Sequence, residues 1–154
     1  RKYYSMALFG GKKSGTPKIV KPIDPKWAKT SSGAFNRLLS FDPESANIRD
    51  VGGVYIVWHG GVKPAWVYAG ETPNLARSIN ELLDNDDVTQ FEINGKLYVS
   101  WSPVLEEFRR GVVLYLTQTL KPEVVNPRAP TAETDETYLI PVLLPGEEPK
   151  KQSD

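Results

Sequence analysis

The fold of this chain is decided by residues 53–75, which read GVYIVWHGGVKPAWVYAGETPNL. Two apolar runs, Gly53–Trp58 and Ala65–Ala69, flank a glycine-rich turn, which is typical of two strands paired as a hairpin. The first run is apolar almost throughout, as expected for a central strand that is covered on both faces. Thr72 then reads as a helix N-cap with Pro73 at the first helical position, so the stretch predicts strand, strand and helix.

The apolar patterns that follow predict a second hairpin and a second long helix. Asn94-Gly95 separates Thr89–Ile93 from Lys96–Trp101, and this dipeptide favours a tight two-residue turn between strands. An amphipathic helical pattern begins at Leu105 and ends before Pro122. We therefore expect an α+β fold, in which a small antiparallel or mixed sheet is flanked by helices and carries extended N- and C-terminal arms.

Length and composition indicate one ordinary globular domain. The chain has 154 residues, of which 40% are hydrophobic and 25% charged, and it contains no cysteine. Disulfides, thiolate metal sites and cysteine nucleophiles are therefore excluded. No apolar run approaches the roughly 20 residues that span a bilayer, so we expect no transmembrane segment. The compartment is not fixed by these features, although an intracellular location, in the cytoplasm or an organelle, is favoured.

The charge is distributed unevenly along the chain. Residues 1–37 contain nine Lys or Arg and one acid, a net charge of +8, and the remainder sums to −8 because the whole chain is neutral. We divide the chain into a basic extended arm (1–30), a domain (31–126) and a Pro-rich tail (127–154). The arm either lies on an acidic partner, such as nucleic acid, a lipid surface or an acidic protein, or is a solvated leader.

The tail contains an apolar run between Tyr138 and Leu144, interrupted and closed by prolines. The run either folds back onto the domain or docks on another protein as an extended strand, and the prolines favour an edge position. The candidate partner-binding residues of the two terminal segments are Lys12, Lys13, Lys18, Lys21, Trp27, Tyr138, Leu139, Ile140, Val142 and Leu143.

Four short motifs occur in order over roughly residues 51–126. They are Gly53-Val54-Tyr55, Tyr68-Ala69-Gly70, Thr72-Pro73-Asn74-Leu75, and Leu120-Lys121-Pro122 followed by Asn126. In this combination the chain resembles a GIY-YIG nuclease domain. The resemblance implies hydrolysis of a phosphodiester, with two tyrosines near the attacking water, an arginine on the first helix, and one glutamate on the last helix that holds a divalent metal.

Two of the residues that the resemblance implies are missing from their positions. The arginine position falls at Ser78, and the adjacent Arg77 lies about 100° around the helix. The glutamate position falls at Val113, and Glu106 lies about 10 Å earlier along the helix. Because a valine supplies no oxygen ligand, we expect no metal and no other cofactor.

The leading hypothesis is a catalytically degenerate GIY-YIG-like domain that acts as a structural or scaffolding subunit. Its partners would be protein subunits of a larger assembly, contacted through the terminal arms. One alternative is a divergent nuclease that uses Mg²⁺ or Mn²⁺ with Tyr55, Tyr68, Arg77 and either Glu106 or Glu71. Another is a non-cleaving nucleic-acid-binding subunit of a ribonucleoprotein, whose N-terminal arm neutralises phosphates.

Two further groups of side chains are assigned from their positions. His59, the only histidine, falls in the glycine-rich turn and is expected at the surface. Trp58, Trp66 and Trp101 fall on expected strands. Core packing is their simplest assignment, and base stacking is the alternative.

Overall fold

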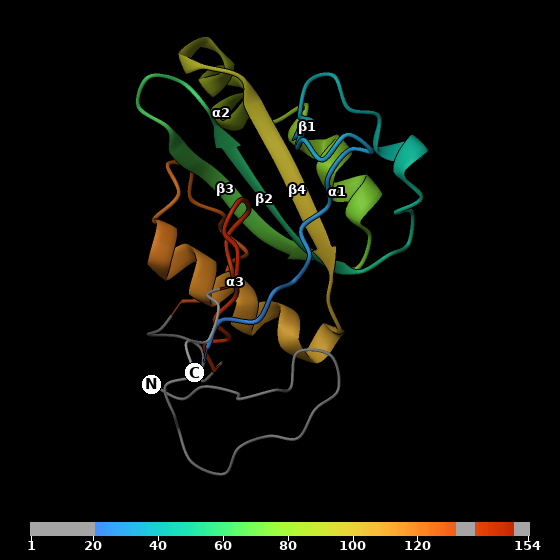
Figure 1. Cartoon of the computed structure of the whole chain (residues 1–154), viewed down its shortest axis with the longest axis vertical. Helices are drawn as coiled ribbons and strands as arrows, with labels where there is room; N and C mark the ends of the chain where they lie inside the picture. The colour runs from blue at the N-terminus through green and yellow to red at the C-terminus, as the bar shows by residue number, and fades with distance from the viewer. Residues whose placement is uncertain (1–20, 132–137, 150–154) are drawn as a thin grey trace.

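A four-stranded antiparallel sheet with three α-helices forms the body of the molecule, as seen in a computed structural model that describes residues 21–131 and 138–149 (Figure 1). The α+β prediction is thereby confirmed. The elements in chain order are β1 (Asn36–Arg37), a 3-10 helix η1 (Pro43–Ala46), β2 (Gly53–His59), β3 (Ala65–Thr72), α1 (Leu75–Leu82), α2 (Asp86–Thr89), a 3-10 helix η2 (Gln90–Asn94), β4 (Leu97–Pro103) and α3 (Glu106–Leu120). No helix among the described residues is long and apolar enough to cross a bilayer.

The predicted first strand, β2, lies at the centre of the sheet. The spatial order is β1-β4-β2-β3, so β2 pairs on one side with β3, its hairpin partner, and on the other with β4. Val54, Ile56 and Val57 have no exposed surface, because both faces of this strand are covered. The near-continuous apolar run is explained by this central position.

Alternate residues of the sheet face two separate apolar cores. On one face, Val57 and Val99 pack with Leu75 and Ile79 of α1 and with Val88 of α2. On the other face, the core is built around α3. Its buried members include Val54, Ile56, Ala69, Phe108, Val112 and Leu116.

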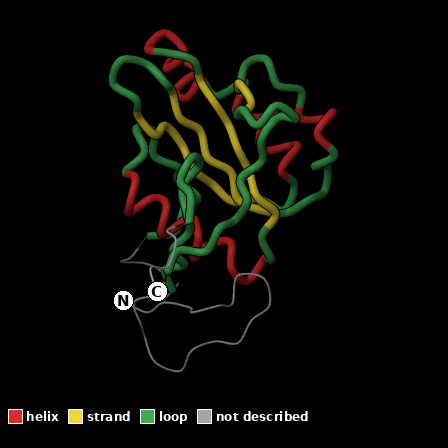
Figure 2. The backbone as a smooth tube through the Cα atoms, in the orientation of Figure 1, coloured by secondary structure: helices red, strands yellow, loops and turns green. Residues whose placement is uncertain are grey.

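The second core is completed by two segments from opposite ends of the described chain (Figure 2). Ile23 and Val142 form a parallel bridge, and the Trp27 indole nitrogen donates a hydrogen bond to the Leu143 carbonyl at 2.7 Å. The Ile140 amide donates to the carbonyl of Gly111 in α3 at 3.1 Å. A side chain at Gly111 would lie 2.5 Å from the Tyr138 carbonyl oxygen, so glycine permits this close approach.

Of the two alternatives for the apolar run of the tail, the structure therefore has the one in which the run folds back onto the domain. Four of its proposed partner-binding side chains are buried within the chain itself, as is Trp27. The four are Leu139, Ile140, Val142 and Leu143. Lys21 is exposed, whereas Lys12, Lys13 and Lys18 lie outside the described residues.

The hairpin predicted at Asn94-Gly95 is wrong. Residues 86–94 are helical, and β4 pairs with β2 and β1 instead of with a strand before the turn. The helical start is set by Asn85, whose side-chain oxygen accepts hydrogen bonds from the amides of Asp87 and Val88. This cap, together with acids in the first helical turn, outweighed the β-propensity of the following residues.

Two smaller predictions are also corrected. The N-cap of α1 is Asn74, whose side chain accepts from the Arg77 amide at 3.2 Å, and Thr72 is the last residue of β3. His59 is buried and stacks on Phe91 with 6.0 Å between ring centroids, because it is the last residue of β2 and not part of the exposed turn.

The packing of the C-terminal segment leads to a stability prediction. We expect Ile140→Ala to lower the free energy of unfolding by about 2–5 kcal/mol, because it removes a fully buried side chain from the second core. Val125→Ala is the control, since Val125 is 82% exposed and its truncation is expected to cost less than about 0.5 kcal/mol. Urea denaturation of both variants measures the difference, and equal stabilities would show that the segment does not contribute to the core.

Candidate functional site

A pocket of about 360 Å³ opens where the two motif strands meet the helices. Residues of β2, β3, α1 and α3 contribute to it, together with the irregular segment that follows α3. Its polar lining side chains are Tyr55, Tyr68, Glu71, Thr72, Ser78, Glu81, Asn85, Asn126 and Arg128. Because these groups come from parts of the chain that are far apart in sequence, the pocket exists only in the folded protein.

Two stacked tyrosines form one wall of the pocket. Tyr55 of β2 and Tyr68 of β3 have ring centroids 6.3 Å apart, with an angle of 26° between their planes. Tyr55 lies opposite Gly70 in the strand register. A Cβ atom at Gly70 would lie 2.5 Å from the Tyr55 hydroxyl, so the glycine leaves the space that this ring occupies.

The glycine of the first motif has a different role. A Cβ atom at Gly53 would overlap the backbone carbonyl of Ser102 in the neighbouring strand β4. Since backbone atoms of a paired strand cannot move aside, glycine is required for β2 and β4 to pair at this point. Both motif glycines are therefore explained by close packing around the central strand.

Asn126 connects the segment after α3 to the tyrosine wall. Its side-chain nitrogen donates to the Ala69 carbonyl at 3.0 Å, and its side-chain oxygen accepts from the Arg128 amide at 3.0 Å. These bonds hold residues 126–128 against β3, which brings the Arg128 guanidinium to the pocket. No sequence pattern indicated this cation, because Arg128 lies beyond the predicted helix in an irregular segment.

The electrostatics of the pocket keep the tyrosines neutral. Burial raises the pKa of Tyr55 far above its usual value, and Tyr68, Glu81 and Glu71 raise it further, while Arg128 partly opposes them. Burial also raises the pKa of Tyr68, again opposed by Arg128. Both hydroxyls are thus hydrogen-bond donors and acceptors near neutral pH, and phenolate is disfavoured.

The two positions where the resemblance requires charged residues both face this pocket. Ser78 lines it from α1 and donates a hydrogen bond to the Thr72 hydroxyl at 2.7 Å. Val113 lines it from α3 and has no exposed surface. Arg77 and Glu106, the residues suggested for a shifted site, are exposed and do not line the pocket.

Two carboxylates do reach the pocket. Glu71 follows the second motif directly, and Glu81 lies three residues after Ser78, on the same face of α1. From the sequence alone, Glu71 is identified as a candidate metal ligand but Glu81 is not. The helical spacing between Ser78 and Glu81 could have indicated that both face the pocket. Within residues 21–131 and 138–149, no three acidic or histidine side chains gather closely enough to hold a metal ion.

Comparison with known proteins does not extend this assignment. No family model, curated protein or solved structure matches the chain. The resemblance to the GIY-YIG nuclease domain therefore stays a prediction from the motifs, and the site is interpreted from its own geometry.

The environment of Tyr55 predicts an alkaline loss of stability. A folded-state pKa above the unfolded value of about 10 means that the unfolded state releases its proton first, so stability falls as the pH rises past 10. We expect Tyr55→Phe to remove part of this fall, up to about 1.4 kcal/mol per pH unit. Urea denaturation between pH 8 and 11, with Val125→Ala as the control, measures the slopes, and identical slopes would contradict the assignment.

Proposed function

We propose that this chain is a GIY-YIG-like domain that has kept the fold and lost the hydrolytic reaction, and that it serves as a structural subunit of a larger assembly. The observation that carries the proposal is the pair Ser78 and Val113. Both side chains line the tyrosine pocket, at the positions where a phosphate-binding cation and a metal ligand are needed. A register slip that brings Arg77 into the pocket is not supported, because Arg77 is exposed.

The chemistry of the pocket supports an inactive site. A catalytic divalent ion needs hard oxygen ligands, and the buried side chain of Val113 offers none. Deprotonation of the attacking water needs a base that is unprotonated at working pH. The raised pKa values of Tyr55 and Tyr68 favour the protonated phenols, so neither tyrosine is suited to this role.

The proposed structural role is based on the two terminal segments of the chain. Trp27 and the apolar side chains of residues 139–143 are buried within the chain, so they serve the domain itself. Contact with partners is therefore assigned to the basic side chains Lys12, Lys13, Lys18 and Lys21 of the N-terminal arm. An arm with a net positive charge suits an acidic protein surface or nucleic acid.

A divergent nuclease is the second candidate, and one observation favours it. Glu71, Glu81 and Arg128 line the same pocket as the two tyrosines. A carboxylate could hold a Mg²⁺ or Mn²⁺ ion, and Arg128 could neutralise a phosphate in place of an arginine on α1. This arrangement keeps the tyrosines and Glu71 suggested by the sequence, and it uses Arg128 in place of Arg77.

A cleavage assay separates the two candidates. The full chain is incubated with single- and double-stranded DNA and RNA in the presence of Mg²⁺ or Mn²⁺, beside the Tyr68→Phe and Glu71→Gln variants. We expect no cleavage above the background that the two variants show. Metal-dependent cleavage that is lost in both variants, while their unfolding free energies stay close to wild type, would establish the nuclease instead.

The structural role is tested by the size of the particle that contains the chain. We expect gentle fractionation of a native extract to recover the chain in a complex larger than the chain alone. We also expect salt to dissociate this complex, because ionic contacts of exposed lysines are screened at high ionic strength. Recovery of the chain as a free monomer at low salt would contradict a scaffolding function.

A further inference from the structure

Three aromatic side chains form a row across the sheet, on the face opposite the Tyr55 and Tyr68 rings. Trp58 of β2 pairs in register with Tyr98 of β4 on one side and with Trp66 of β3 on the other. The Trp58 ring centroid lies 5.9 Å from that of Tyr98 and 5.6 Å from that of Trp66. The row therefore crosses three adjacent strands, and the distances between its rings are close to the distance between neighbouring strands.

A β-bulge places Trp66 on the second face, where Trp58 already lies by the alternation of β2. The register between β2 and β3 shifts between Val57 and Trp58, so Trp66 and Tyr68 pack in different cores although they are two residues apart. Tyr98, Trp58 and Trp66 do not line the tyrosine pocket. Any ligand of the row would be independent of the function proposed for that pocket.

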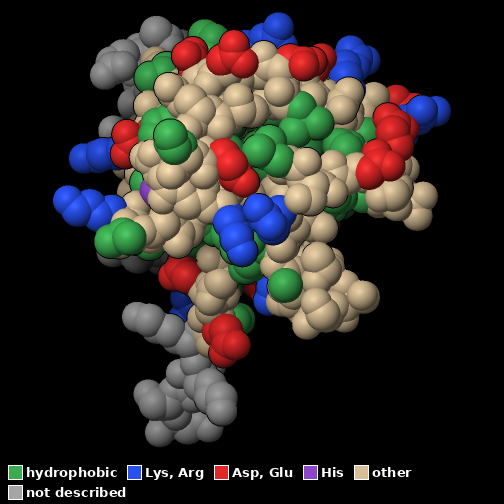
Figure 3. Space-filling view, turned by 90° about the horizontal axis from the view of Figure 1, so that it is seen from above, with side chains coloured by type: hydrophobic (Ala, Val, Ile, Leu, Met, Phe, Trp, Pro, Cys, Tyr) green, Lys and Arg blue, Asp and Glu red, His purple; other side chains and the backbone are tan. Residues whose placement is uncertain are grey.

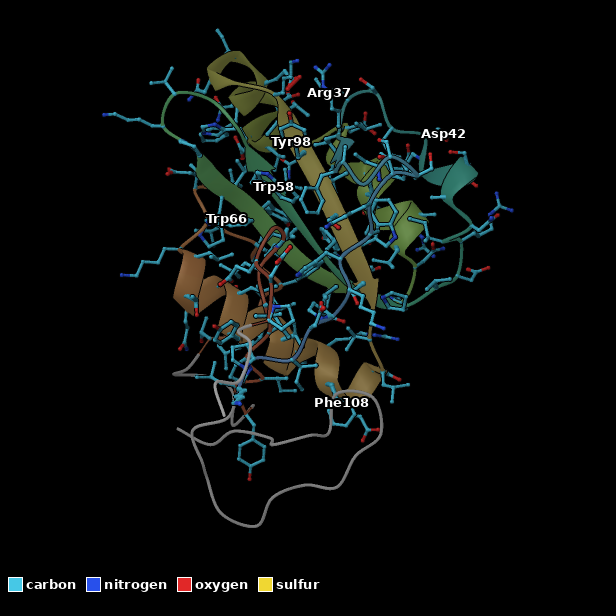
Figure 4. The ribbon with its side chains drawn as sticks, in the orientation of Figure 1. Arg37, Asp42, Trp58, Trp66, Tyr98 and Phe108 are labelled. Atoms are coloured by element: carbon cyan, nitrogen blue, oxygen red, sulfur yellow. The ribbon has the colours of Figure 1, made fainter. Side chains whose placement is uncertain are left out.

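The row is left partly open to solvent. Figure 4 shows Tyr98, Trp58 and Trp66 in succession across the sheet. All three side chains are only half-buried, and Phe35 packs edge-on against Trp58 with 5.0 Å between ring centroids. Large aromatic rings that are fixed by one another but remain accessible suit a planar ligand.

Two cations border the row. Arg37 of β1 is opposite Tyr98 in the register, so it continues the row at the edge of the sheet, and its side chain is 44% exposed. The Lys29 ammonium lies 5.4 Å from the ring centroid of Phe35. Both residues belong to the segment 1–37 with its net charge of +8.

Acidic side chains also occur near the row. The Glu92 carboxylate lies 3.4 Å from one guanidinium nitrogen of Arg37. Glu123 lies beside β3, because its backbone amide donates a hydrogen bond to the Trp66 carbonyl. Seen from above, this end of the molecule mixes acidic and basic groups (Figure 3). A uniformly positive field is thus not available, and stacking has to supply a large share of the affinity.

We propose that Tyr98, Trp58 and Trp66 are a stacking platform for the unpaired bases of a single-stranded nucleic acid. Successive bases lie on the rings, and Arg37 and Lys29 contact the phosphates. The flanking cations favour this ligand over a proline-rich peptide, which also binds aromatic surfaces but carries no repeating negative charge. Sequence-tolerant binding is expected, because every base has a π-face.

A binding assay with the full chain tests the proposal. Fluorescence anisotropy measures the binding of fluorescein-labelled single-stranded DNA and RNA of about 12 nucleotides. We expect Trp66→Leu and Tyr98→Leu each to weaken binding by about 5- to 150-fold, because each removes one stacked base contact. Val62→Ala and Ile93→Ala are matched controls, since these apolar side chains are 100% and 90% exposed but lie outside the row. Both controls are expected to bind like wild type.

A second readout does not depend on variants. Bases that stack on Trp58 and Trp66 are expected to quench the intrinsic tryptophan fluorescence of the wild-type chain at the same concentration that raises the anisotropy. Salt-sensitive binding without quenching, and with unchanged affinity in Trp66→Leu and Tyr98→Leu, would assign the contact to the basic arm and overturn the platform. Absence of binding, or binding of a proline-rich peptide in its place, would overturn the nucleic-acid ligand.

Discussion

The burial of β2 between two strands and two cores is the constraint on which the rest of this structure depends. Val54, Ile56 and Val57 are completely buried, so both faces of the sheet must be covered near this strand. Helices α1 and α2 cover one face, and α3 covers part of the other. The close approach of β4 also depends on β2, because only glycine at position 53 leaves room for the Ser102 carbonyl.

Helix α3 alone does not cover the second face, and the terminal segments complete it. Their contact is made of specific bonds as well as apolar packing, since Ile23 exchanges backbone hydrogen bonds with Pro141 and Leu143. Ser100 and Ser102 of β4 likewise donate to the carbonyls of Ala28 and Pro25. Buried hydroxyls of this kind need partners, so residues 25–28 belong to the fold energetically and not merely to a leader.

The two faces of one strand contribute to two different surfaces. Tyr55 points to a polar pocket that holds carboxylates and a guanidinium. Trp58, three residues later, points to an open aromatic row. Because side chains alternate along a strand, one short stretch of sequence contributes to both surfaces.

Local signals in the sequence are sufficient for the hairpin of β2 and β3 and for helices α1 and α3, which follow from apolar periodicity and turn residues. The pairing of β4, the return of residues 139–143 to the domain and the arrival of Arg128 at the pocket depend on the folded chain. These contacts join residues far apart in the chain, and their free energy comes from burial against surfaces that exist only after the sheet has formed.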